Sequence, residues 1–374
     1  MTDLAKLRDI ERLLSLCLKP EEAPLPADEA EWERLVALAF EHSVLSLLWL
    51  RLRERELPPP VRARLWSFYS WNLAQNRELR AEQERIMAAL GTAQIPVRTL
   101  KGLDLSETAY GDIGARECLD LDLLIPPQNL ERADGVLAQL GYRRTPELPL
   151  EKFARSQELR YERSTEGGRL FTLDLHLRIL PYRPDDPFTV RVWAEGMTRE
   201  CLLLYMCMKQ VVHRFVGAKH LCDLRAVFAW AGGQFDWARF LEAARELGFA
   251  PGIALSLEWL RECSGAAVPE EVIQTLRPGR LNRALLRRVV GETPAAALAQ
   301  GEKLVGPYGA FALVACATPG SARRQQVWRL LFPSPTYVRQ YYRAGPHQAT
   351  WPIYLGRLAS KVPLALWQLV RRGR

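Results

Sequence analysis

A short apolar run with two aspartates spaced two apart constrains the fold of this chain more than any other feature. Residues 119–125 read Leu-Asp-Leu-Asp-Leu-Leu-Ile, with the acids at Asp120 and Asp122. Because side chains two apart on a strand point to one face of a sheet, both carboxylates are predicted to lie side by side. Adjacent carboxylates repel each other unless a cation lies between them. Oxygen ligands on a rigid element suit Mg²⁺ or Mn²⁺, and the plainer alternative is an edge strand with one solvated face.

Predicted strands and helices alternate around this run. Residues 95–102 are apolar and end in Lys-Gly, which indicates a strand, and residues 103–110 indicate a helix. After the acidic run, residues 128–140 carry apolar side chains at helical spacing, and Gly141 is a typical helix-closing residue. The order of strand, helix, strand and helix predicts an α+β fold built around a small α/β unit.

A third acidic residue lies on a predicted β-hairpin. The Glu-Gly-Gly sequence at residues 166–168 is a turn signal, so residues 159–163 and 169–178 are expected to pair. Apolar and polar residues alternate along the second strand, and this places Asp174 and His176 on its polar face. If the two acidic strands are neighbours, this carboxylate can join the aspartate pair.

The order of these motifs resembles that of the bacterial family of uncharacterised nucleotidyltransferases, within the superfamily that has a polymerase-β-like palm. The residues that carry the likeness are Leu100-Lys101-Gly102, Arg116, Asp120-Leu121-Asp122-Leu123-Leu124, Gly141-Tyr142 and Asp174-Leu175-His176. The likeness covers residues 95–178 well and the flanks more loosely. It implies a polymerase-β-like core with a mixed sheet, flanked by N- and C-terminal helical regions. The chain departs from the superfamily pattern in having Lys-Gly where Gly-Ser or Gly-Gly is usual.

The resemblance implies an enzyme that transfers a nucleotidyl group from an NTP, with ATP expected, to an unidentified acceptor such as a peptide or saccharide intermediate. The implied cofactor is Mg²⁺ or Mn²⁺, and the implied catalytic and metal-binding residues are Asp120, Asp122 and Asp174. The implied nucleotide- and phosphate-binding residues are Lys101, Gly102, Arg116, His176 and Lys219. Attack at another phosphorus would give phosphoryl or pyrophosphoryl transfer. The alternative function is a catalytically retired binding module anchored by a basic tail.

Several of these candidates also have a structural interpretation. Arg116 could balance the acidic residues beside it, and Lys101 could be a solvated lysine at a strand end. His176 could be a hydrogen-bonded core residue, and Lys219 could pair with charges near a helix start. If the acidic pair is unpartnered without metal, Asp122→Asn should leave the melting temperature of the metal-free protein level or higher, because it relieves repulsion.

Shifts in composition and chain-breaking prolines and glycines divide the chain into four regions. They are an N-terminal helical region at 1–90, the palm at 91–195, a helical domain at 196–300 and a basic aromatic tail at 301–374. The 7 cysteines are scattered without a Cys-x-x-Cys pair, which argues against a zinc knuckle or a disulfide framework. Reduced cysteines and the lack of a leader-like start lead us to expect a cytoplasmic protein.

Positive charge is concentrated in the tail. Residues 303–374 contain 11 Lys and Arg and no Asp or Glu, whereas residues 1–302 contain 40 basic and 43 acidic residues. Tryptophan and tyrosine are interspersed with the basic residues. Such a tail suits packing on the body of the protein or binding to an anionic membrane surface, and nucleic acid is a less favoured partner. Arg357, Lys361 and two prolines disfavour a membrane span, so the membrane alternative is peripheral attachment at the inner face.

Overall fold

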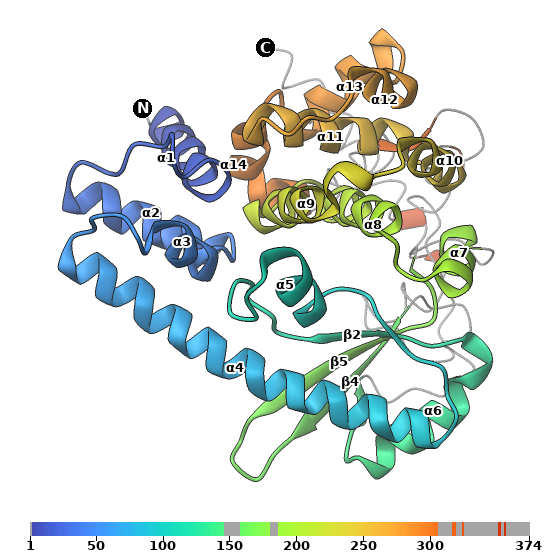
Figure 1. Ribbon diagram of the computed structural model, residues 1–374. Coiled ribbons are helices and arrows are strands. Elements are labelled where there is room, and N and C mark those ends of the chain that lie inside the picture. The colour runs from blue at the N-terminus through green and yellow to red at the C-terminus, as the bar shows by residue number, and fades with distance from the viewer. Residues whose placement is uncertain are drawn as a thin grey trace. The chain divides into compact units, whose positions relative to one another are not determined.

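The computed structural model describes residues 2–145, 158–179, 186–305 and 316–318, together with residues 324, 351–352 and 355–356. The chain divides into two compact units (Figure 1). The sheet unit comprises Pro20–Arg199 and Ala226–Gly233, and the helical unit comprises Met1–Lys19, Glu200–Arg225 and Gln234–Arg374. The sheet unit therefore contains every acidic residue proposed for catalysis.

The sheet unit combines helices with a five-stranded sheet. Its helices are α2 (Glu29–Glu41), α3 (Leu45–Leu52), α4 (Pro59–Thr92), α5 (Leu103–Tyr110), η1 (Pro127–Asn129), α6 (Leu130–Gln139) and α7 (Pro187–Glu195). Its strands are β1 (Arg98–Thr99), β2 (Leu121–Leu124), β3 (Arg143–Thr145), β4 (Glu158–Ser164) and β5 (Leu170–His176). The strand order is β1-β2-β5-β4-β3, in which β2 and β5 run parallel and the other neighbours run antiparallel. The predicted α+β fold with a mixed sheet is confirmed.

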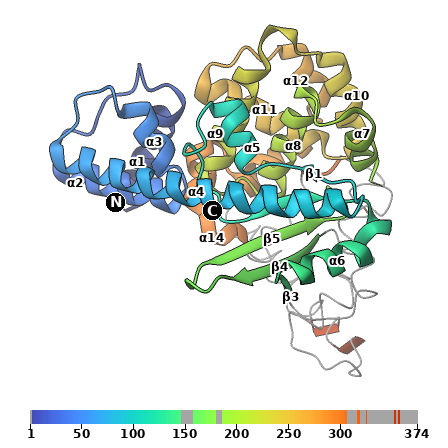
Figure 2. The same cartoon turned by 60° about the horizontal axis from the view of Figure 1, so that its bottom comes forward.

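One face of this sheet packs against α4 and α6, which Figure 2 shows alongside the strands. The shared apolar cluster includes Leu121, Leu123, Tyr161, Leu173 and Leu175 from the strands, Leu79, Ile86 and Leu90 from α4, and Ala133 and Leu137 from α6. Each fully buried leucine contributes on the order of 2 kcal/mol through removal of apolar surface from water. Burial of the leucines at alternate positions thus orients the intervening residues of β2 and β5 toward the opposite face.

The long helix α4 follows from its sequence. It begins with prolines at its first turn, where a missing N–H costs nothing, and its buried residues recur at spacings of three and four. Two asparagines, Asn72 and Asn76, interrupt the apolar stripe and are buried. Buried amides need hydrogen-bond partners, and the functional site below supplies them.

The helical unit is built around one central helix. Its helices are α1 (Thr2–Leu18), α8 (Arg199–Val212), α10 (Trp237–Leu247), α11 (Ala250–Ser264), α12 (Glu270–Leu276), α13 (Arg280–Val290) and α14 (Pro294–Val305). Helix α9 (Ala218–Ala231) begins in this unit and ends in the sheet unit, and η3 (Gly232–Gln234) follows it. Helix α11 is buried along most of its length, and a Cβ at Gly252 would lie 2.7 Å from Cγ2 of Val211. Glycine is therefore needed where α8 and α11 approach closely.

Two predicted strands are shorter than expected. The apolar segment at residues 95–102 contributes only Arg98–Thr99 to the sheet, because Pro96 has no N–H to donate and Gly102 turns the chain away with φ at +76°. The acidic strand begins at Leu121, so Asp120 precedes it and is half-buried. The argument from strand periodicity therefore applies to Asp122 more strictly than to Asp120.

The tail lies largely outside the described residues. Only short pieces of residues 306–374 are described, so the predicted binding of the basic aromatic segment falls outside this description. Among the helices in the described part of the chain, none combines the length and the apolar character needed to cross a bilayer.

Candidate functional site

The pairing of β2 with β5 places two aspartates side by side. In the register of these parallel strands, Asp122 lies directly opposite Asp174, and Leu124 lies opposite His176. Neighbouring residues in register share a face of the sheet, and this face is the one opposite the apolar cluster. Both aspartates are buried, at 5% and 8% exposure. Two carboxylates removed from water at adjacent positions require nearby cations or donors.

Asp122 is held between a lysine and a histidine. Its Oδ2 lies 2.8 Å from Nζ of Lys101, and its Oδ1 lies 2.9 Å from Nε2 of His176. An ionised carboxylate only accepts hydrogen bonds, so Nε2 of His176 must carry the proton. Nδ1 of the same ring lies 3.4 Å from Oε2 of Glu158, which is long for a hydrogen bond. His176 therefore orients Asp122 from within the sheet.

Asp174 is paired with an arginine of the neighbouring strand. Arg160 lies opposite Asp174 in the β4–β5 ladder, and its guanidinium donates from Nε to Oδ1 at 2.9 Å and from Nη2 to Oδ2 at 3.0 Å. The hydrogen bonds to Asp174 raise the pKa of Arg160, and the charges of Asp120 and Glu158 add to the effect. This parallel two-bond geometry is the strongest that an exposed or half-exposed arginine makes with a carboxylate.

The remaining acidic and basic candidates lie at different places. Asp120 is close enough to Arg160 for its charge to raise the pKa of the guanidinium, but it sits ahead of β2 and is half-buried. Lys219 is on α9, in the part of that helix that belongs to the helical unit. Its predicted contact with nucleotide stays a prediction.

Lys101 and Gly102 directly precede α5 and form the segment by which the chain enters this helix, the entry to α5. Leu100 donates its backbone N–H to the carbonyl of Asp122 at 3.2 Å, which brings Lys101 alongside this aspartate. Gly102 is the N-cap residue of α5, with φ at +76° and no atom within 4 Å of where a Cβ would lie. Only glycine adopts this backbone conformation at little cost, and within the described ranges no side chain caps the helix. The first N–H groups of α5 are thus left for an anion to approach.

Arg116 contacts the residues at the start of α5 from the buried side. The residue is buried at 5% exposure, and its Nη1 donates to the carbonyl of Gly102 at 2.8 Å. Its backbone N–H donates to Oγ of Ser106 in α5 at 3.2 Å. The structure therefore places the guanidinium where it supports the Gly102 turn, and the predicted contact of Arg116 with phosphate stays a prediction.

The buried asparagines of α4 hold the segment that carries Arg116. Nδ2 of Asn72 donates to the carbonyls of Gly114 and Arg116, both at 2.9 Å. Nδ2 of Asn76 donates to the carbonyls of Ile113 at 2.6 Å and Arg116 at 2.8 Å. These bonds satisfy carbonyls of a segment that is neither strand nor helix, and they link α4 to the turn before β2.

We expect Asn76→Ala to destabilise the sheet unit by about 2 kcal/mol, because two hydrogen bonds are lost and the carbonyls of Ile113 and Arg116 each keep only their second donor. Urea unfolding followed by tryptophan fluorescence measures this loss. Gln75→Ala, one position along the same helix, is the control and should change stability by less than about 0.5 kcal/mol. Equal stability of the two variants would show that the asparagine does not hold the turn.

The donor set can be compared with what a divalent ion requires. Asp122 and Asp174 supply hard oxygen atoms from adjacent rigid strands, which suits Mg²⁺ or Mn²⁺. No three His, Cys, Asp or Glu side chains converge as a ready metal cage anywhere in the part of the chain that the structure describes. The carboxylates instead contact Lys101 and Arg160. They fit a metal in type and position, provided that these two cations withdraw.

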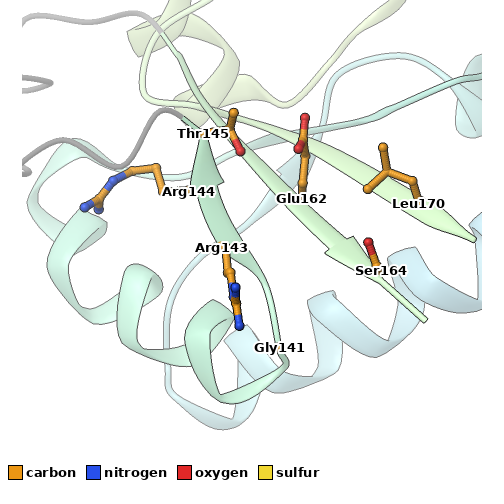
Figure 3. A pocket seen from close by; sticks show the side chains of 7 residues that line it. All are labelled: Gly141, Arg143, Arg144, Thr145, Glu162, Ser164 and Leu170. Carbon is orange, nitrogen blue, oxygen red and sulfur yellow. The ribbon is translucent and has the colours of Figure 1, made fainter. Parts of the chain in front are cut away.

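A shallow cavity lies on the same face of the sheet, nearer its outer edge. Its volume is about 570 Å³, and Figure 3 shows the residues that line it: Gly141, Arg143, Arg144, Thr145, Glu162, Ser164 and Leu170. The guanidinium of Arg144 is directed elsewhere and bonds Asp134 at 2.6 Å. Arg143 and Glu162 face each other in the β3–β4 register but form no ion pair among the described residues. The cavity is separate from the aspartate pair.

Sequence reasoning did not identify Arg160, although a signal was present. A hairpin that folds about Gly167 pairs positions equally distant from it, and Arg160 and Asp174 are both seven residues away. The register is set by the turn, in which Gly168 donates to the carbonyl of Thr165 at 3.0 Å. The asparagines of α4 carried no comparable signal, because their partners lie about 40 residues away in the chain.

Of the comparisons with known proteins, one assigns the chain to a family. No curated protein and no solved structure matches the chain. The family model described as "Uncharacterised nucleotidyltransferase" matches residues 28–265, which include the whole sheet, the aspartate pair and the entry to α5. Because the match covers more than half of the sequence, the chain belongs to this family of uncharacterised nucleotidyltransferases.

Proposed function

We propose that the protein transfers a nucleotidyl group from an NTP to an acceptor, at the aspartate pair of the sheet unit and with Mg²⁺ or Mn²⁺. The observation that carries the proposal is the register that places Asp122 directly opposite Asp174 on adjacent parallel strands. Two carboxylates with a purely structural role would gain nothing from being buried next to each other. A pair that receives divalent ions and phosphates needs this closeness.

Each side chain would have a distinct part in the reaction. Asp122 and Asp174 would hold the metal, with Asp120 completing the ligand set from the segment before β2. When bound, the metal would promote deprotonation of the acceptor and offset the charge that develops on the leaving pyrophosphate. Asp174 would lie on the acceptor side and would be suited to receive the acceptor's proton. His176 would keep the Asp122 carboxylate oriented through its 2.9 Å hydrogen bond.

The entry to α5 would receive the phosphates. Lys101 carries a positive charge beside Asp122, and the uncapped N-terminus of α5 begins at Gly102. Backbone N–H groups and the helix dipole favour an anion at such a terminus. These groups compensate for the Gly-Ser or Gly-Gly pair that the superfamily usually has at this point. Arg116 would contribute indirectly by holding the Gly102 carbonyl.

For the acceptor, only a chemical class is proposed. A hydroxyl, phosphate or carboxylate of a peptide or saccharide intermediate would be consistent with the resemblance, and ATP is the expected donor. A retired binding module is the second candidate, and the pairing of both aspartates with protein cations is the observation that favours it. The nucleotidyltransferase would convert the NTP to product, whereas the retired module would only bind it.

Incubation of the purified protein with each NTP, Mg²⁺ and a small-molecule cell extract should release pyrophosphate and place the α-phosphate label on a product. Asp174→Asn is the matched control and should release none above background. Label from the γ-phosphate would instead indicate phosphoryl transfer. Binding of NTP without transfer of any label, equal in the two proteins, would favour the retired module.

A further inference from the structure

We propose that Arg160 binds the phosphates of the incoming nucleotide and, in the nucleotide-free protein, neutralises Asp174 in place of the metal. This inference rests on the proposed function, because it assumes that Asp174 receives a divalent ion. It assigns a phosphate-binding role to a residue outside the motifs of the sequence. It also accounts for the arginine that lies against a buried carboxylate beside a second one.

The geometry allows Arg160 to change partners. Its side chain is 50% exposed, whereas that of Asp174 is 11% exposed, so the guanidinium covers the carboxylate from the solvent side. The residue is on β4, next to β5, and its other register neighbour is Thr145, which has a short side chain. A long side chain with one exposed end can turn without disturbing the backbone.

The two cations flank the aspartate pair on opposite sides. Lys101 reaches Asp122 from the segment after β1, and Arg160 reaches Asp174 from β4. The guanidinium occupies both oxygens of Asp174, so a divalent ion cannot share that carboxylate without displacing at least one hydrogen bond. Repulsion between the ion and the guanidinium acts in the same direction.

A displaced guanidinium beside a triphosphate has an obvious new partner. The planar fork of arginine matches two oxygens of a phosphate as well as it matches a carboxylate. A nucleotide held at Lys101 and the start of α5 would lie over the aspartate pair, within reach of a residue on the adjacent strand. Asp120 and Glu158 are the competing local partners, since the charge of each acts on Arg160.

The test measures binding of Mn²⁺ alone by electron paramagnetic resonance, and binding of a non-hydrolysable ATP analogue at saturating Mn²⁺ by calorimetry. In Arg160→Gln, we expect Mn²⁺ alone to bind several-fold more tightly, because its competitor is gone. We expect the analogue to bind at least about 10-fold more weakly, because a charged phosphate contact is lost. Arg160→Lys keeps the charge without the fork and should fall between.

Arg143→Gln is the matched control, since it removes the same charge from the same face of the sheet at a residue that does not touch Asp174. It should leave both affinities unchanged. Weaker binding of both ligands to Arg160→Gln would mark Arg160 as structural support. Tighter binding of both would mark it as a competitor that never contacts phosphate, and no change in either would make it a bystander.

The failure of this inference can be told apart from failure of the proposed function. Asp174→Asn should weaken binding of Mn²⁺ whether or not Arg160 contacts phosphate. If Asp174→Asn and the wild-type protein bind Mn²⁺ equally, the metal site itself is misplaced. If only the Arg160 variants behave unexpectedly, the metal site stands and the proposed change of partner is wrong.

Discussion

Asp122→Asn is expected to reduce nucleotidyl transfer at least about 1,000-fold, the loss that corresponds to roughly 4 kcal/mol of transition-state stabilisation by a metal ligand. The amide keeps the shape of the side chain but not its charge. A fixed-time assay of α-phosphate transfer to product measures the effect. Glu162→Gln changes a carboxylate on the same face of the sheet that forms no ion pair within the described part of the chain; it is the control and should retain activity.

The stability of Asp122→Asn is a second test, because the sequence and the structure predict opposite changes in its melting temperature. Repulsion between unpartnered aspartates predicts that Asp122→Asn is neutral or stabilising without metal. The structure places Lys101 and His176 against this carboxylate, whose side chain is only 3% exposed. We therefore expect the metal-free protein to lose about 2 kcal/mol, because the partly buried ammonium of Lys101 loses the charge of this close partner and the amide accepts more weakly from His176. An unchanged or higher melting temperature would contradict the observed pairing.

Glu82→Gln should strongly destabilise the sheet unit, with a loss of roughly 3 kcal/mol at neutral pH. Glu82 is a buried residue of α4 that accepts hydrogen bonds from Tyr142 and Arg85, both at 2.7 Å, and from Arg163 at 2.7 and 3.0 Å. These contacts join the helix to the sheet. A fall of roughly 6–10 °C in the melting temperature of this unit is expected.

The pH dependence of this loss has a definite sign. Burial acts to raise the pKa of Glu82, but hydrogen bonds from Arg85, Tyr142 and Arg163 outweigh it and lower the pKa from 4.5 to about 2. A carboxylate with a depressed pKa in the folded state stabilises the protein fully above its unfolded value. The stabilisation is lost as the pH falls from about 5 toward 2.

Melting temperatures of the wild-type protein and Glu82→Gln should therefore converge as the pH is lowered from 7 to 3. Glu84→Gln, an exposed carboxylate on the same helix, is the control and should parallel the wild-type curve. A difference between Glu82→Gln and wild type that stays constant with pH would show that loss of charge is not the cause.

Local features of the fold followed from the sequence. The sequence predicted a helix at residues 103–110, and α5 begins at Leu103 and ends at Tyr110 as expected; the spacing of apolar residues predicted α6. The glycine turn predicted the hairpin of β4 and β5, and the alternation of leucine with aspartate predicted which face of each strand is apolar. These properties depend on neighbours within a few residues, so composition and spacing are sufficient to determine them.

The partners of the charged residues were decided only by the tertiary structure. Asp122 and Asp174 are 52 positions apart, and their adjacency depends on β2 and β5 being neighbours in the sheet. Likewise, Arg116 is turned onto the Gly102 carbonyl because α4 brings buried amides to its backbone. By itself, the sequence determined the order of the strands and helices around the aspartates and which faces of β2 and β5 are polar, but not where each strand begins. Which cation pairs with which carboxylate depends on contacts between residues that are tens of positions apart in the sequence. Only the tertiary structure sets those contacts.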